Sequence, residues 1–364
     1  MVMKKEEEII VYQNPDPLLV SRQGIFPGIS LLPNNNLLII FSIGQAFDSS
    51  DQRAFVTKSS DNGRTWSKPK ELHNHIYDNH EETDTLKPLL LQNGEMIATG
   101  YAFVRPDALT PIVDPISFDV LPLKNKISFS KDLGESWSVP NVFNVLDKPL
   151  EISGPCIQLA TGRILAACPP FHLGETGHSG WIIYSDDNGK SWNKLSDFFN
   201  SPNGEIAAWE CRLCEIDNNG VAVIFWTYDN IKKINLNNHI VYSHDGGKSF
   251  GEAIDTGVKA QASNLMWLEK NIILTIHSHR ESPSGLIVRK VNIENDKFEI
   301  LDELDLFKNE NMGSDSTNIS KQFGSLKFGQ PSLIKLQNNE VFATCWCYEN
   351  NQHIIKSFLV NLYN

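Results

Sequence analysis

The 364-residue sequence predicts an all-β fold, a six-bladed β-propeller built from four-stranded antiparallel blades. Two repeating patterns predict this fold. One is an eight-residue motif that occurs four times, and the other is a pair of apolar runs joined by a polar turn, which occurs six times. Repeats of this kind are typical of propellers, in which each repeat forms one small sheet.

A strand near the N-terminus has no partner of its own. The segment EEIIVYQ (7–13) has the composition of a strand, and it precedes the first repeat. Because unpaired strand edges are unfavourable, we expect this strand to complete the sixth blade and so to close the ring.

Six segments have the pattern of the first hairpin of a blade. They lie at 27–41, 87–101, 154–168, 211–225, 263–276 and 330–345. Each consists of short apolar runs bounded by turn-forming residues. Six hairpins predict six blades, although unrelated hairpins in a β-sandwich or a β-helix would produce similar runs.

The eight-residue motif has the form S-x-D-x-G-x-[ST]-[WF]. It occurs as SSDNGRTW (59–66), SKDLGESW (130–137), SDDNGKSW (185–192) and SHDGGKSF (243–250). We expect the Asp to cap backbone N–H groups of a turn, the Gly to adopt a positive φ and the aromatic residue to pack into the blade. The motif therefore predicts a structural role for Asp61, Asp132, Asp187 and Asp245.

Composition indicates one domain, residues 1–364, because no Pro/Gly/Ser linker divides the chain. A net charge of −12 without a Lys/Arg run argues against nucleic acid or an anionic membrane as partner. The sequence has neither a transmembrane-length run nor the apolar core of a signal peptide, so a cytoplasmic location is expected.

Six cysteines without a second pair at zinc spacing predict no metal, and no cofactor is predicted. The oligomeric state stays open.

A site is expected at one end of the propeller, where residues before each first strand and loops between second and third strands gather. The candidate catalytic residues there are Glu210, Asp48 and Asp51. The candidate substrate-binding residues are Arg22, Arg53, Asp84, Arg105, Glu151, His172, Trp209, Arg212, Tyr228, Arg280 and Gln330. Carboxylates supply a general acid and base, arginines bind acidic groups, and aromatic rings stack on sugars. The set predicts a carbohydrate partner, acidic or neutral.

On these motifs the chain resembles the sialidase (BNR/Asp-box) superfamily over almost its whole length. The resemblance implies a six-bladed propeller and an exo-acting glycoside hydrolase with three substrate-binding arginines, a Tyr nucleophile activated by a Glu, and a loop Asp as acid/base. In SRQGIFPG (21–28), Arg22 matches the first arginine, and Asp48 or Asp51 matches the loop Asp. Glu210 matches the activating Glu, with Arg212 on the same strand face.

Two positions depart from the family pattern. The segment FWTYDN (225–230) supplies no second arginine, although Arg280 could stand for the third. Gln330 occupies the position of the Tyr nucleophile, and an amide cannot perform that attack. The sequence therefore predicts a sialidase-like glycosidase that acts on a sugar other than sialic acid.

Two alternatives stay open. One is a carbohydrate-binding propeller without catalysis, since propellers often serve as interaction platforms. The other is a uronate-type polysaccharide lyase that would use His172, His178, His277 or His279 as base beside a charge-neutralising Arg. The many carboxylates before the inner strands favour an enzyme over a binding module.

Overall fold

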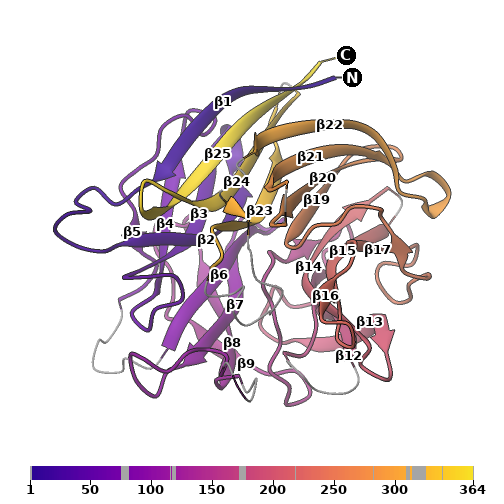
Figure 1. Cartoon of the computed structure of the whole chain (residues 1–364), viewed down its shortest axis with the longest axis horizontal. Helices are drawn as coiled ribbons and strands as arrows, with labels where there is room; N and C mark the ends of the chain where they lie inside the picture. Colours follow the sequence, from indigo (N-terminus) through magenta and orange to yellow (C-terminus); the bar gives the residue numbers. More distant parts are fainter. Residues whose placement is uncertain are drawn as a thin grey trace.

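The computed structural model describes residues 2–74, 82–114, 116, 120–171, 178–217, 219–281, 283–308, 312–313, 325–337 and 339–363. These residues form six antiparallel sheets that follow one another in chain order around a central axis (Figure 1). Each sheet is one blade with four strands in its main path, as predicted, and the fourth blade carries a short additional strand.

The first blade consists of β2 (Gln23–Leu31), β3 (Leu37–Gly44), β4 (Arg53–Ser59) and β5 (Lys70–Glu71). The second consists of β6 (Glu82–Leu90), β7 (Met96–Val104), β8 (Leu123–Ser130) and β9 (Asn141–Phe143). The third consists of β10 (Ile157–Gln158), β11 (Ile164–Cys168), β12 (His178–Ser185) and β13 (Asn193–Ser201). The fourth blade consists of β14 (Ile206–Ile216), β15 (Gly220–Asp229), β16 (Ile234–Asn235), β17 (His239–Ser243) and β18 (Ile254–Asp255). The fifth consists of β19 (Ser263–Glu269), β20 (Ile272–His279), β21 (Gly285–Asn292) and β22 (Glu299–Lys308). Two short 3-10 helices occur, η1 (Pro33–Asn35) and η2 (Glu294–Asp296). No helix in the described part of the chain is long and apolar enough to cross a bilayer.

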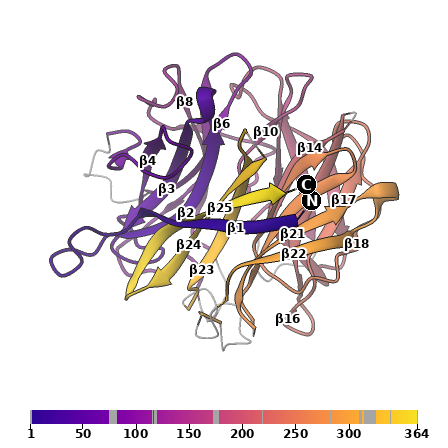
Figure 2. The ribbon, with the colours of Figure 1, turned by 90° about the horizontal axis from the view of Figure 1, so that it is seen from above.

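The sixth blade closes the ring. It consists of β23 (Phe328–Lys335), β24 (Glu340–Glu349), β25 (Gln352–Tyr363) and the N-terminal strand β1 (Val2–Tyr12). Strand β1 runs antiparallel to β25, so the two termini lie side by side (Figures 1 and 2). The predicted closure is confirmed, and the closing strand begins five residues before the segment 7–13 from which it was predicted.

The Asp boxes form the turns after the third strand of blades one to four. In the fourth box, the Ser249 backbone N–H and hydroxyl donate to the Asp245 carboxylate at 2.9 and 2.6 Å, and the Gly247 N–H donates to the Ser243 hydroxyl at 2.9 Å. The hydrogen bonds from Ser249 lower the pKa of Asp245 to about 2. Because strands alternate in direction, these turns lie at the opposite end of the blades from the loops between second and third strands.

Each box glycine also packs against the preceding blade. A Cβ on Gly63 would lie 2.2 Å from Cε2 of Phe342 in β24, and one on Gly134 would lie 2.3 Å from Cδ1 of Leu38 in β3. The boxes thus hold neighbouring blades together, and the apolar core lies between them.

Replacement of Gly63 by Ala is expected to destabilise the protein more than replacement of Gly94 by Ala. The two glycines have nearly the same φ, +87° and +84°, but a Cβ on Gly94 meets nothing within 4 Å. Both variants carry the backbone cost of about 1 kcal/mol, and the clash with Phe342 adds about 1–3 kcal/mol to the first. Chemical denaturation measures the difference, and equal losses would contradict packing between blades as its cause.

Candidate active site

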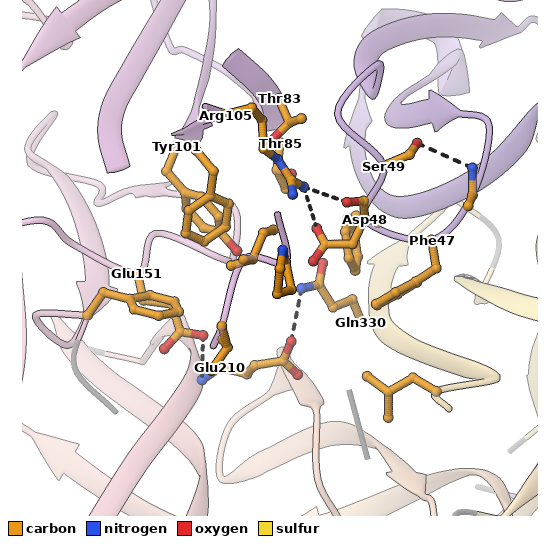
Figure 3. A pocket seen from close by; sticks show the side chains of 18 of the residues that line it. Phe47, Asp48, Ser49, Thr83, Thr85, Tyr101, Arg105, Glu151, Glu210 and Gln330 are labelled. Carbon is orange, nitrogen blue, oxygen red and sulfur yellow. Dashed lines mark hydrogen bonds and ion pairs between the residues drawn. The ribbon is translucent and has the colours of Figure 1, made fainter. Parts of the chain in front are cut away.

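A cavity of about 520 Å³ lies at the predicted end of the propeller, and residues from all six blades line it (Figure 3). Its volume is typical of small-molecule sites. The predicted site residues that line it are Asp48, Arg105, Glu151, Trp209, Glu210, Arg280 and Gln330. The structure therefore brings together residues that are far apart in the sequence.

Three innermost strands carry a β-bulge at the cavity. The register shifts between Ile25 and Gly28 in β2, between Trp209 and Arg212 in β14, and between Gly329 and Ser332 in β23. At each shift one lining residue has a positive φ: 55° at Phe26, 45° at Glu210 and 42° at Gln330. Such a backbone costs about 1–3 kcal/mol per residue and is found mostly at functional sites.

Glu210 and Gln330 point toward one another from blades four and six (Figure 3). The Gln330 Nε2 donates to Glu210 Oε1 at 2.9 Å. The other oxygens, Glu210 Oε2 and Gln330 Oε1, are buried and have no hydrogen-bond partner among the described residues. A buried polar atom without a partner costs about 1–3 kcal/mol, and a hydrogen bond donated by a ligand would remove this cost.

Glu151 lies beside this pair, just before β10. Its Oε1 accepts a hydrogen bond from the Glu210 backbone N–H at 3.4 Å. Burial and, to a smaller extent, the Glu210 charge raise the pKa of Glu151 to about 8, against the opposing effect of Arg212. At neutral pH the Glu151 carboxyl is therefore protonated and can donate a hydrogen bond.

The Glu151→Gln variant is expected to be more stable than the wild type by roughly 4 kcal/mol at pH 8.5, and by only about 1 kcal/mol at pH 5. The folded wild type keeps the Glu151 proton up to about pH 8, whereas the unfolded chain releases it near pH 4.5. Wild-type stability therefore falls as pH rises between these values, and a glutamine has no such loss. Denaturation at both pH values measures the gap. A gap that stays constant with pH would contradict the raised pKa.

Asp48 and Arg105 form a charged pair between loops of blades one and two. The Arg105 Nη2 lies 3.5 Å from Asp48 Oδ1 and also donates to the Asp48 backbone oxygen. Burial raises the pKa of Asp48 to about 6, and Arg105 moderates the rise. About 32% of the Asp48 side chain is still exposed, so its carboxyl can reach a ligand. Asp51, the other candidate, does not line the cavity and accepts hydrogen bonds from Gln45 and Ser49 within its loop.

Arg280 adds a second positive charge at the cavity. Its Nε donates to the Phe328 oxygen at 2.8 Å and its Nη1 to Gln261 Oε1 at 2.9 Å. A Cβ at position 329 would lie 1.8 Å from Arg280 Nη2, so Gly329 makes room for the guanidinium. Among the described residues, no group of three or more His, Cys, Asp or Glu side chains is placed to hold a metal ion.

Several predicted arginines do not reach the cavity wall. Arg22 is exposed and lies over the Phe55 ring at 5.3 Å. Arg53 is buried and donates to the backbone oxygens of Ser50 and Gln52. Arg212 donates to Ser153 and to the Cys211 oxygen, because the bulge in β14 separates it from the face that Glu210 occupies.

Two other candidates are turned away from the cavity. Asp84 in β6 stands between Thr83 and Thr85, which do line the cavity, and alternation along a strand places it on the other face. Tyr228 is buried with its ring stacked on Trp209, the centroids 5.0 Å apart. His172 lies outside the described residues, and no histidine is among the described residues that line the cavity.

The sequence prediction missed the apolar part of the cavity and the phenol of Tyr101. The lining includes Tyr101 and Phe103 of β7 and the loop residues 108–113. Burial raises the pKa of Tyr101 well above its usual value, and the nearby carboxylates add to this, so its hydroxyl stays protonated. The sequence prediction depends on the polar residues of this loop, although the run of apolar residues at 108–113 is also present in the sequence.

Comparison with known proteins supports the fold. The BNR/Asp-box repeat model matches residues 183–194. A protein of unknown function from Dyadobacter fermentans is 19% identical, with a TM-score of 0.77 over 99% of both chains. The NanB sialidase of Streptococcus pneumoniae is 14% identical, with a TM-score of 0.66 over 97% of this chain and 70% of its own. A leech intramolecular trans-sialidase is also 14% identical, with a TM-score of 0.64 over 99% and 70%.

A sequence search of curated proteins finds no significant match. At these identities the structural likeness establishes the fold alone. The chain is therefore a divergent six-bladed β-propeller with BNR/Asp-box repeats and the fold of the sialidases.

Proposed function

We propose that the protein is an exo-acting glycoside hydrolase, with Asp48 as general acid/base and Glu210 as the second catalytic carboxylate. The observation that carries this proposal is the Glu210–Gln330 hydrogen bond, which positions a carboxylate whose other oxygen is unpartnered at the cavity. Both carboxylates line one cavity to which all six blades contribute, which suits the end of a glycan better than its middle.

The reaction consumes one water and breaks the bond between the anomeric carbon and the leaving-group oxygen. Asp48 donates its proton to that oxygen as the bond breaks. Glu210 either takes a proton from the water that attacks the anomeric carbon, or attacks that carbon itself. In the second case, Asp48 then deprotonates the water that hydrolyses the glycosyl ester. The two schemes invert and retain the anomeric configuration, respectively.

The charges of the cavity favour a sugar other than sialic acid. Among the described lining residues only Arg105 and Arg280 are basic, and Arg105 is already engaged by Asp48 and Thr110. Gln330 offers an amide, which binds hydroxyl groups and cannot act as a nucleophile. A neutral sugar, or one with a single acidic group that Arg280 contacts, fits this set.

Turnover of a panel of aryl glycosides tests the proposal. The panel contains sialic acid, uronic acids, neutral hexoses and deoxy sugars, and we expect cleavage of a neutral or uronic acid glycoside. Robust cleavage of the sialoside would contradict the assigned sugar class. Tight binding of a sugar without cleavage of any glycoside would instead favour the non-catalytic carbohydrate-binding propeller.

A further inference from the structure

We infer that the site acts on glycosides with an apolar leaving group, which packs against an apolar wall formed by Phe103, Leu109, Pro111, Ile112, Val113 and Phe171. This inference rests on the proposed function, because it assigns the two sides of the same cavity to the two parts of a glycoside. It adds the chemical class of the group that leaves.

The residues of the wall come from blades two and three. The Phe103 ring packs edge-on against Phe171, with centroids 5.8 Å apart, and against Tyr101 at 5.5 Å. Ile112 packs into the same cluster. Leu109 is 91% exposed while it also lines the cavity. An apolar patch at a cavity mouth of this kind marks a binding surface.

The loop that carries Leu109 is held in place. The Asp107 carboxylate accepts hydrogen bonds from the backbone N–H groups of Leu109 and Thr110, both at 2.7 Å, and from the Thr110 hydroxyl at 2.7 Å. Arg105 donates to the Thr110 backbone oxygen at 3.3 Å. The leucine is therefore presented in a defined position before any ligand arrives, which lowers the entropy cost of binding.

The same arginine connects this loop to the proposed acid. Arg105 contacts both Thr110 and Asp48, so the wall begins beside Asp48. A general acid protonates the leaving-group oxygen, so the leaving group must lie next to it. In Figure 3, Gln330 lies between Asp48 and Glu210, and Glu151 and Glu210 lie on the far side of Gln330 from Arg105. The polar side chains of Glu151, Glu210 and Gln330 suit the hydroxyl groups of the sugar. We therefore assign the apolar wall to the leaving group.

Methyl, butyl and hexyl glycosides of the sugar that is cleaved best test this inference. Their leaving alcohols have similar acidity, so differences in kcat/KM report contacts rather than chemistry. Each methylene that reaches the wall is expected to raise kcat/KM about fourfold, with the rise levelling off as the wall is filled. A flat series with full turnover would overturn the inference and leave the proposed hydrolysis intact.

Leu109→Asn is expected to lower kcat/KM for the hexyl glycoside about tenfold and to lower it much less for the methyl glycoside. Leu18→Asn is the matched control, since Leu18 is fully exposed and does not line the cavity. It should leave the whole series unchanged. Equal losses for both alkyl lengths in Leu109→Asn would overturn the inference.

A binding measurement separates this inference from the proposed hydrolysis. If no glycoside of the aryl panel is cleaved, the proposed function fails, and the alkyl series is then made on the sugar of the panel that binds most tightly. Calorimetric titration then compares hexyl and methyl glycosides on the wild type and Leu109→Asn. Tighter binding of the hexyl glycoside, lost in the variant, would support the wall, and equal binding would overturn it.

Discussion

Replacement of Glu210 by Gln is expected to lower kcat by about 10²–10⁴-fold on the glycoside that the wild type cleaves best. The variant keeps an oxygen that can accept the hydrogen bond from Gln330, so the bulge and the fold should persist. It loses the charge that takes a proton from water or attacks the anomeric carbon. Steady-state kinetics measure the loss, and substrate KM should change much less than kcat.

Glu205→Gln is the matched control for this variant. Glu205 is exposed just before β14, does not line the cavity, and undergoes the same chemical change. It should behave as the wild type. If Glu210→Gln retains kcat within about threefold of the wild type, another group carries the reaction and the assignment of Glu210 is wrong.

Replacement of Asp48 by Asn is expected to have the second large effect, and that effect should depend on the leaving group. An alkyl alcohol needs a proton as it departs, so its kcat/KM should fall by about 10²–10⁴-fold. A nitrophenolate leaves without a proton, so the loss for nitrophenyl glycosides should be far smaller. Asp51→Asn, on the same loop but away from the cavity, is the control. Equal losses for both leaving groups would exclude an acid role for Asp48.

The pH profile tests the same group independently. The protein raises the pKa of Asp48 from 3.8 to about 6, so the carboxyl keeps its proton up to that pH. Because a general acid works only when protonated, wild-type kcat/KM for alkyl glycosides should fall as pH rises above about 6. The Asp48→Asn variant should lack this fall in its residual activity. A fall at the same pH in the variant would assign it to another group.

The proposed acid also has a defined electrostatic partner. Arg105 lowers the pKa of Asp48 against the effect of burial, and it ties the loop of Asp48 to the loop of Leu109. The acid and the apolar wall are therefore positioned by one buried side chain. This arrangement explains why a loop with an exposed leucine can contribute to a well-ordered site.

The fold could be predicted from the sequence because the features that specify it are local. The Asp-box turn at Asp245 closes through contacts within seven residues, from Ser243 to Ser249, and each hairpin pairs two neighbouring segments. Alternation along the chain sets which strand faces are apolar. Even the closing strand near the N-terminus could be identified, because a strand-like segment without a local partner must pair elsewhere.

The composition of the site depended on the tertiary structure. The pattern of the chain placed Glu210, Asp48 and Gln330 near one end of the propeller, but it contained no signal for the bulges at Glu210 and Gln330. A bulge changes which side chains face the axis, and so Glu210 lines the cavity while Arg212 does not. The contact between Glu210 and Gln330 joins blades four and six, and only the closed ring brings them within hydrogen-bonding distance.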